Sequence, residues 1–209
     1  MRIFDISVTL KNSIPSWPGE KGFSMNSASK ENITVSEISM GIHTGTHVDA
    51  PYHFLPDGKR IDELPLDKFI GPARVCLIQN PKEISEKELK KIDLTGCQRL
   101  LFKTDNSLTS WEDENFSENY IALSQSGAEY LAEKGVSLIG VDYLSVEPFH
   151  SGGSVHTTLL NKEIALLEGL NLKDVPEGDY FLFSAPLKIR GAEGSPVRAI
   201  LIPLEDLVP

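Results

Sequence analysis

The sequence predicts one α/β domain over residues 1–209, and three observations support this fold class. Short apolar runs bounded by glycine, proline or polar residues recur along the chain, with the length that buried strands have. Amphipathic stretches with helical spacing alternate with some of these runs, and residues 124–134 are the clearest example. The length of 209 residues, with 40% hydrophobic and 24% charged side chains, is typical of a globular domain with a sizeable core.

The first half of the chain is expected to consist mostly of strands and turns. Residues 2–10 alternate between apolar and polar side chains and predict a first strand, which a proline-containing loop at 11–21 follows. Residues 32–42 predict a second strand, and a change of phase near Ser36 indicates a bulge. The next elements are expected to be a turn, a short helix and a buried strand, at 56–59, 65–70 and 73–79.

The second half is expected to alternate helices with strands. Residues 85–92 predict a helix, with Ser85 at its N-cap and Glu88 completing a capping box. The polar stretch 104–120 predicts either a variable surface loop or a functional lid. The helix over 124–134 should end at Gly135, and the strands expected around these elements lie at 99–103, 137–141, 180–184 and 197–202.

Charge and cysteine content limit the possible partners and the compartment. Thirty acidic and 20 basic side chains give a formal net charge of −10, which argues against nucleic acid and anionic membranes as partners. The N-terminus carries an acid at Asp5 and no long apolar run, so we expect neither a secretory signal nor a membrane span. Cys76 and Cys97 form no motif, and Cys76 in a predicted buried strand favours a reduced thiol and a cytoplasmic location.

The densest polar motif contains three of the five histidines and one aspartate between His43 and His53. His43, His47, Asp49 and His53 are interspersed with apolar residues, and buried histidine or carboxylate groups require a partner. A divalent metal would be such a partner, and a polar network without metal is the alternative. Nitrogen and oxygen donors without a thiolate favour zinc, manganese or iron.

The spacing within this motif indicates a tight turn and a strand rather than a helix. His43 and His47 are four residues apart, as on one helix face, but Gly45, the flanking threonines and a nearby proline disfavour that helix. On a strand, His47 and Asp49 share one face, and a turn at Gly45 brings His43 to the same point. His53 lies beyond the proline and is expected near the site but turned away from the ligand cluster.

A second informative stretch contains the remaining histidines, His150 and His156, together with Glu168. Residues 164–170 predict an apolar helix, in which an acid is better explained as a ligand than as a surface residue. His156 and Glu168 would lie roughly 18 Å apart on one helix at about 1.5 Å per residue. The chain must therefore bend near residues 161–162 if both side chains reach one metal. Spacing alone does not choose between the two histidines.

Residues 43–54, His-Thr-Gly-Thr-His-Val-Asp-Ala-Pro-Tyr-His-Phe, resemble the H-x-G-T-H-x-D-x-P-x-H-F signature of the cyclase family, which includes bacterial kynurenine formamidase and isatin hydrolase. Further similar segments extend the resemblance over almost the whole chain, at 14–19, 140–142, 156–172 and 195–199. The resemblance implies the swivelling β/β/α architecture of this family, a mixed sheet with flanking helices.

The resemblance also implies two metal ions per chain, zinc foremost with manganese as the alternative, and it selects His156 over His150, which is assigned to a mobile loop. Asp49 would bridge the two metals. The first metal would be held by His43, His47 and Asp49, and the second by Asp49, His156 and Glu168.

Two further residues receive roles in the expected reaction. His53 is the remaining histidine of the motif, and imidazole titrates near neutral pH, so it is assigned general acid/base catalysis. Trp17, between prolines in the loop 11–21, either caps the core or lines a pocket for a planar substrate. The second interpretation follows the substrate contact of a tryptophan in a similar segment of kynurenine formamidase.

The sequence therefore predicts a metal-dependent hydrolase of a C–N amide bond, in which metal-activated water attacks the carbonyl and His53 handles the proton. By resemblance, an arylformamide such as N-formylkynurenine is the leading substrate, which implies a place in tryptophan catabolism. A cyclic amide or imide of the isatin type is the next candidate. A non-catalytic metal-binding protein of the same fold is the alternative from a different class, and a closed shell of protein ligands would favour it. The family implies a homodimer or higher homo-oligomer.

Overall fold

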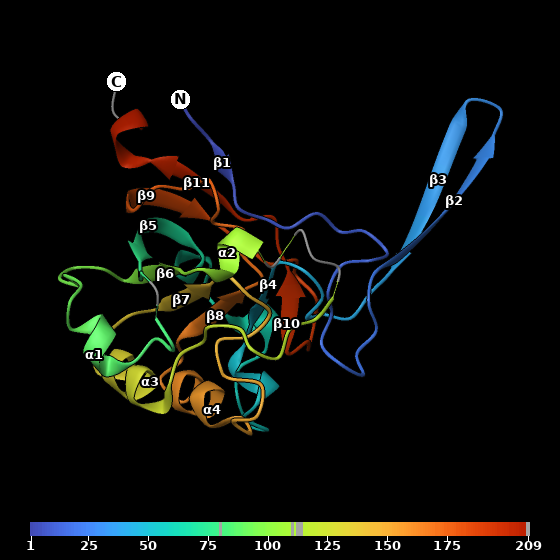
Figure 1. Cartoon of the computed structure of the whole chain (residues 1–209). Coiled ribbons are helices and arrows are strands. Elements are labelled where there is room, and N and C mark those ends of the chain that lie inside the picture. Colours follow the sequence, from blue (N-terminus) through green and yellow to red (C-terminus); the bar gives the residue numbers. More distant parts are fainter. Residues whose placement is uncertain (80, 110, 112–114, 208–209) are drawn as a thin grey trace.

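The computed structural model describes residues 1–79, 81–109, 111 and 115–207. Within these residues the centre of the molecule is a nine-stranded mixed sheet, which curls so that its two ends lie on different sides of the body (Figure 1). Its strands, in spatial order, are β1 (Phe4–Asp5), β11 (Ile200–Pro203), β9 (Gly178–Phe183), β5 (Ile70–Leu77), β6 (Arg99–Lys103), β7 (Leu138–Val141), β8 (Ala165–Glu168), β4 (His47–Asp49) and β10 (Gly194–Pro196).

The middle of the sheet is parallel and its two wings are antiparallel. Strands β5, β6, β7 and β8 pair in parallel, and parallel neighbours require crossover connections. Helices provide or accompany these crossovers on one face of the sheet, namely α1 (Glu86–Leu89), α3 (Gln125–Ala132) and α4 (Ser154–Leu160) (Figure 1). None of the described helices is long and apolar enough to cross a membrane. The expected α/β fold, a mixed sheet with flanking helices, is confirmed.

Alternating side chains of the central strands divide the core into two layers. On β6, Leu100 and Phe102 pack with α3 and α4, whereas Leu101 joins the cluster on the opposite face. On β8, Leu166 faces the helices and Leu167 faces away. Because successive strand residues point to opposite faces, the residue after Leu167 must return to the helix side. This alternation determines where the polar residues of β8 and its neighbours lie.

Several predicted elements agree with the structure. Strand β6 has the predicted limits, and strands β5 and β7 overlap the predictions at 73–79 and 137–141. Helix α3 begins after Ser124, whose side chain accepts a hydrogen bond from the Gly127 amide, and Gly135 follows the helix with φ of 71°. The turn at 56–59 is present, and the short helix expected at 65–70 is the 3-10 helix η3 (Leu66–Lys68).

The predicted apolar helix at 164–170 is wrong, because this segment forms strand β8. Both faces of β8 are buried in the two layers of the core. Such a strand carries a continuous apolar run that cannot be told from a buried helix by periodicity. The bend expected at 161–162 is nevertheless present, since α4 ends before Asn161 and β8 begins at Ala165.

Three other expectations differ in detail. Ser85 lies at the N-cap of the one-turn helix α1 but makes no capping hydrogen bond, and Glu88 pairs with Lys91 rather than closing a capping box. The strand expected at 2–10 is reduced to β1, with an isolated bridge between Ser7 and Leu170. The predictions at 180–184 and 197–202 overlap β9 and β11, whereas the short strand β10, just before the second of them, was not predicted.

The predicted strand at 32–42 is one arm of a hairpin that projects from the body (Figure 1). Strand β2 (Ser24–Lys30) pairs with β3 (Ile33–Ser39) residue by residue, so the bulge predicted near Ser36 is wrong. The change of phase is tolerated because both faces of β3 are exposed. Within the predicted loop 104–120 the structure contains helix α2 (Asn106–Thr109), while residues 110 and 112–114 lie outside the described residues.

Candidate metal centre

Strands β4 and β8 place three polar side chains on the helix side of the sheet. They pair antiparallel, with His47 opposite Glu168 and Val48 opposite Leu167. Val48 and Leu167 belong to the core layer away from the helices, so His47, Asp49 and Glu168 point to the other side, towards α4. The predicted common face of His47 and Asp49 is confirmed by this register, and Glu168 joins them from the neighbouring strand.

A turn at Gly45 returns the chain so that His43 reaches the same cluster. Gly45 has φ of 73°, and a Cβ there would lie 2.7 Å from Leu10 Cδ2, so both conformation and space favour glycine. The turn is held by Thr46 Oγ1, which donates to the Gly169 carbonyl at 2.6 Å. As a result His43 Nδ1 lies 2.9 Å from Asp49 Oδ1, as the sequence predicted.

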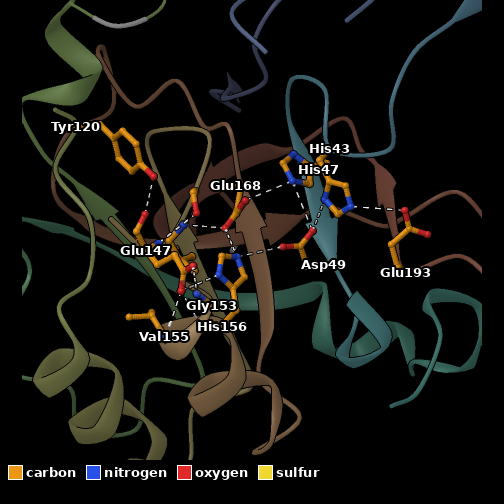
Figure 2. A network of polar contacts seen from close by, with 12 residues as sticks. His43, His47, Asp49, Tyr120, Glu147, Gly153, Val155, His156, Glu168 and Glu193 are labelled. Atoms are coloured by element: carbon orange, nitrogen blue, oxygen red, sulfur yellow. Dashed lines mark hydrogen bonds and ion pairs between the residues drawn. The ribbon is translucent and has the colours of Figure 1, made fainter. Parts of the chain in front are cut away.

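Helix α4 supplies His156 from the other side of the cluster (Figure 2). His156 Nε2 lies 3.4 Å from Glu168 Oε1 and 3.7 Å from Asp49 Oδ2. His47 Nε2 lies 3.4 Å from Glu168 Oε2 and 3.5 Å from Asp49 Oδ1. Each of the two carboxylates therefore directs one oxygen at His47 and the other at His156.

The donor atoms of this cluster fit a metal better than a metal-free polar network. His47 and Asp49 are fully buried, and no regular hydrogen bond within the described chain reaches His47 Nε2 or either Asp49 carboxylate oxygen. Buried polar atoms left in this way are costly unless a cation binds them. One ligand atom from each of His47, Asp49 and Glu168 lies within 4.8 Å of the others, and the same holds for His43, Asp49 and His53.

In His47 and His43, the ring nitrogen that faces away from Asp49 also has an oxygen nearby. His47 Nδ1 donates to the Gly45 carbonyl at 2.9 Å, which leaves Nε2 unprotonated and free to bind a metal in the neutral ring. His43 Nε2 lies 3.6 Å from the Glu193 carboxylate. An oxygen behind each ring is the arrangement that orients metal-binding histidines in proteins.

The pKa values of the metal-free cluster reflect its opposite charges. Burial lowers the pKa of His43, but Asp49 outweighs burial and raises that pKa to about 9. Burial likewise opposes the carboxylates around His156, whose pKa rises to about 10 through Glu147 and Glu168. Burial raises the pKa of Asp49, but His43 reverses this and holds it well below its usual range. Without a metal, protons on the histidines supply the positive charge that the buried acids require.

His53 lies closer to the cluster than the sequence analysis expected. Pro51 begins the 3-10 helix η1 (Pro51–His53), and this single turn carries the imidazole back over the site instead of away from it. The His53 ring stacks on His43, with centroids 4.1 Å apart. Burial lowers the pKa of His53, and the attraction of Asp49 does not fully offset it. A neutral imidazole therefore borders the cluster at neutral pH.

A cavity of about 240 Å³ opens beside these residues. Trp17 lines it, and the indole packs against Phe116 and Phe149 with centroid distances of 5.5 and 5.1 Å. Trp17 thus belongs to the wall of the cavity rather than to the core alone. The remaining lining comes from Glu20, His43, His53, Phe54, Leu144, Ser145, Glu147, His156 and Glu168.

The sequence analysis missed three residues of this region. Phe54 stacks on His156, with ring centroids 4.3 Å apart, Glu147 lies behind the same histidine, and Glu193 lies behind His43. An acid inside the apolar run 144–149 was a signal for Glu147, comparable to the one that identified Glu168. His150, by contrast, has a side chain 81% exposed next to Glu118, which agrees with the choice of His156.

Comparison with known proteins gives the same picture for the chain as a whole. The model of the Cyclase family matches residues 4–148. A kynurenine formamidase of Bacillus cereus is 42% identical over 205 residues, which cover 96% of this chain and 97% of that protein. A kynurenine formamidase of Geobacillus thermodenitrificans is 44% identical over 203 residues, covering 94% and 95% of the two chains.

Solved structures agree with these relatives. A protein from Bacillus stearothermophilus, described as a predicted metal-dependent hydrolase, superimposes with a TM-score of 0.85 at 32% identity, covering 96% of this chain and 97% of that one. Isatin hydrolase A from Ralstonia solanacearum superimposes with a TM-score of 0.82 at 26% identity, covering 96% and 91%. The architecture implied by the sequence resemblance is therefore confirmed.

Proposed function

The chain belongs to the Cyclase family, and from this premise we propose that it hydrolyses an arylformamide such as N-formylkynurenine, releasing formate and the free arylamine. It is a metal-dependent hydrolase. The main support for this substrate is the sequence identity of 42–44% to kynurenine formamidases over nearly the full length of both chains. The cavity beside Trp17, about 240 Å³ in volume, supports a substrate with a single aromatic ring.

Two metal ions are assigned to the cluster by resemblance, although its two close groups of donor atoms, His43 with Asp49 and His53, and His47 with Asp49 and Glu168, divide the residues differently. His43, His47 and Asp49 would hold one ion, and Asp49, His156 and Glu168 the other, with Asp49 between them. The distances of Glu168 to both His47 and His156 favour a second bridging role for this acid. Nitrogen and oxygen donors without thiolate favour zinc, with manganese as the alternative. Such ions, when bound, activate water and polarise a carbonyl near neutral pH.

The side chains around the cluster supply the other requirements of amide hydrolysis. His53 borders the donor atoms and is neutral at pH 7, so it can take up a proton from the attacking water and return it to the leaving nitrogen. Trp17 orients the aromatic ring of the substrate against the wall of the cavity. Phe54, stacked on His156, limits the access of bulk water to this side of the cluster.

A cyclic amide of the isatin type is the second candidate substrate. It is favoured by the similarity to isatin hydrolase A, at 26% identity and a TM-score of 0.82. The same nucleophile and the same proton transfer would open a lactam, so shape and substituents decide between the two substrates. A purely metal-binding role fits less well, because a cavity opens directly beside the cluster and its walls include His53 and Trp17.

The remaining proposals concern the assembly and location of the protein. A homodimer or higher homo-oligomer is supported by the hairpin β2–β3, which carries four exposed large apolar side chains, those of Met25, Ile33, Val35 and Ile38. One hydrolase domain over residues 1–209 is supported by the pairing of β1 with β11, which joins both ends of the chain in one sheet. Free Cys76 and Cys97 support a cytoplasmic location, where the reaction would belong to tryptophan catabolism.

A hydrolysis screen tests the proposed function. The purified protein, loaded separately with zinc and manganese, is given N-formylkynurenine, formanilide, isatin and a cyclic imide, and product formation is followed by chromatography. We expect the arylformamides to be cleaved with the highest kcat/KM. A clear preference for isatin would replace the leading substrate by the second candidate. Absence of turnover with all four compounds, at full metal occupancy, would favour the non-catalytic alternative.

A further inference from the structure

Glu147 is a buried acid that lies directly behind His156, on the side away from the other candidate ligands (Figure 2). Only 7% of Glu147 is exposed, and its Oε2 lies 3.2 Å from His156 Nδ1. No regular hydrogen bond in the described part of the chain reaches Nδ1, so the carboxylate is an acceptor within reach of an otherwise unpartnered ring nitrogen. The other ring nitrogen faces Asp49 and Glu168.

The position of the Glu147 carboxylate is determined by the backbone of α4 rather than by chance packing. Its Oε1 accepts from the Gly153 amide at 2.8 Å, and Oε2 accepts from the amides of Val155 and His156 at 3.1 and 3.3 Å. These are amides at the start of α4, which have no partner inside the helix. Tyr120 adds a further restraint, because its hydroxyl donates to the Glu147 carbonyl at 2.6 Å.

Neutral histidine carries one proton, and the group next to one ring nitrogen decides which nitrogen remains free. A carboxylate beside Nδ1 favours a proton on Nδ1 and leaves the lone pair of Nε2 directed at Asp49 and Glu168. Phe54 stacks on the same ring with an interplanar angle of 15°, which restricts its rotation.

We propose that Glu147 is a positioning residue of the metal centre, which holds His156 in the orientation and tautomer that present Nε2 as a ligand. This inference rests on the proposed metal centre. It assigns Glu147 two tasks, since the same carboxylate fixes the start of α4 and the ring that projects from its first turn. A shift of α4 would therefore move the ligand and its partner together.

The test compares three proteins, the wild type, Glu147→Gln and Val155→Ala. Glutamine retains the shape of the side chain but has one acceptor oxygen, so an amide NH₂ must face either His156 Nδ1 or the helix amides. Val155 is buried on the same helix, and alanine there loosens α4 while leaving its backbone amide in place. The matched control thus removes packing without changing the groups around His156.

Zinc affinity is measured by competition with a chromophoric chelator, and thermal unfolding of the metal-free proteins is measured in parallel. We expect Glu147→Gln to weaken one of the two zinc equivalents by about 10- to 100-fold, the range typical of such outer partners. Val155→Ala should lower the Tm while leaving both zinc affinities within about twofold of the wild type. In ¹⁵N-histidine spectra of the zinc-loaded proteins, the Nδ1 proton of His156 should be present in the wild type and lost or shifted in Glu147→Gln.

Two outcomes would overturn the positioning role alone. If Glu147→Gln lowers the Tm but leaves both zinc affinities and the His156 signal unchanged, Glu147 only stabilises the start of α4. If both variants lose zinc equally, loosening of α4 is the cause. If the wild type itself binds neither zinc nor manganese, the proposed metal centre fails, and the positioning role fails with it.

Discussion

The hairpin at residues 24–39 and the metal-ligand segment at 43–54 are neighbours in the chain but differ in burial and in the extent of strand pairing. The hairpin is exposed on both faces, and its pairs run without interruption from Ser24–Ser39 to Lys30–Ile33. The strand of the ligand segment, β4, has only three residues, yet all three, His47, Val48 and Asp49, are completely buried. Backbone pairing shapes the first segment. Burial of charge, which requires opposite charge nearby, shapes the second.

The comparison predicts that substitutions at the ligand cluster strongly reduce metal binding and activity, whereas substitutions in the hairpin change little. Asp49→Asn should have the largest effect, because Asp49 lies between all the candidate histidine ligands and loses one charged oxygen. We expect neither metal to be retained and activity to fall by more than the roughly 10⁴-fold that marks the upper range for losing an acid or base. Elemental analysis and the hydrolysis assay measure the two effects.

Asp179→Asn is the matched control for Asp49→Asn, since Asp179 is half exposed and pairs with Arg74 at the surface. It should retain both metals and nearly full activity. If Asp49→Asn keeps two equivalents of metal, Asp49 is not the bridging ligand. Buried charge would then not explain why the ligand segment differs from the hairpin.

His53→Ala should retain the metals and lower kcat by about 10² to 10⁴, the range for loss of a positioned acid or base. A substrate with a good leaving group needs no proton on that group and should recover part of the loss. Metal content and kcat are measured on the same preparation.

His150→Ala serves as control for His53→Ala, because the His150 side chain is 81% exposed and lies away from the cluster. Its activity should equal that of the wild type. Loss of metal in His53→Ala would make His53 a ligand, consistent with its closeness to His43 and Asp49, and would contradict the assignment as acid or base.

His156→Ala and Glu168→Ala should have different effects on the zinc affinities of the two metal sites. His156 contacts the acids from one side, so its loss should weaken one equivalent by more than 100-fold, beyond the range for an outer partner. Glu168 faces both His47 and His156, so Glu168→Ala should weaken both equivalents. Titration calorimetry with zinc measures each step. Selective loss of one metal in Glu168→Ala would restore the simpler division, in which Glu168 serves a single ion.

Leu167→Ala and Ile33→Ala compare the stability effects of a buried position beside the ligands and an exposed position in the hairpin, and Ile33→Ala should have the smallest effect of all. Leu167 is fully buried beside the ligands, and its truncation should cost about 2–5 kcal/mol of unfolding free energy. Ile33 is 67% exposed in the hairpin, and its truncation should change that free energy by no more than about 0.5 kcal/mol in the monomer. Urea unfolding at low protein concentration measures both. A cost above that limit for Ile33→Ala, rising with protein concentration, would show that the hairpin packs against a second copy.

Much of the ligand segment was predictable because its geometry is local. Gly45 and the two-residue spacing of His47 and Asp49 determine a turn and a shared strand face without knowledge of distant residues. The position of His53 was not predictable at this level, since a proline can end one conformation or begin a 3-10 turn. The difference between these two outcomes decides whether the imidazole leaves the site or lies over it.

The second half of the site depends on contacts that are distant in sequence. Glu168 was identified as a ligand candidate, but within a helix that is a strand, because a strand buried on both faces has no alternation to reveal it. His156 was selected only by the family resemblance. Strand β2, with the sequence Ser-Met-Asn-Ser-Ala-Ser-Lys, lacked the apolar pattern of a strand, and its pairing with β3 supplies the regularity instead.

Strand β4 has a consequence for the order in which the molecule assembles. Its three residues pair on one side with β8 and on the other with β10, both of which are synthesised more than a hundred residues later. During translation, β4 therefore has no partner strand until the C-terminal strands have been synthesised. Contacts so distant in sequence slow folding, because the long loop must close before they form. Metal binding at this centre would then require that β8 and β10 have already paired with β4. A chain truncated before β10 should therefore be unable to retain its metals.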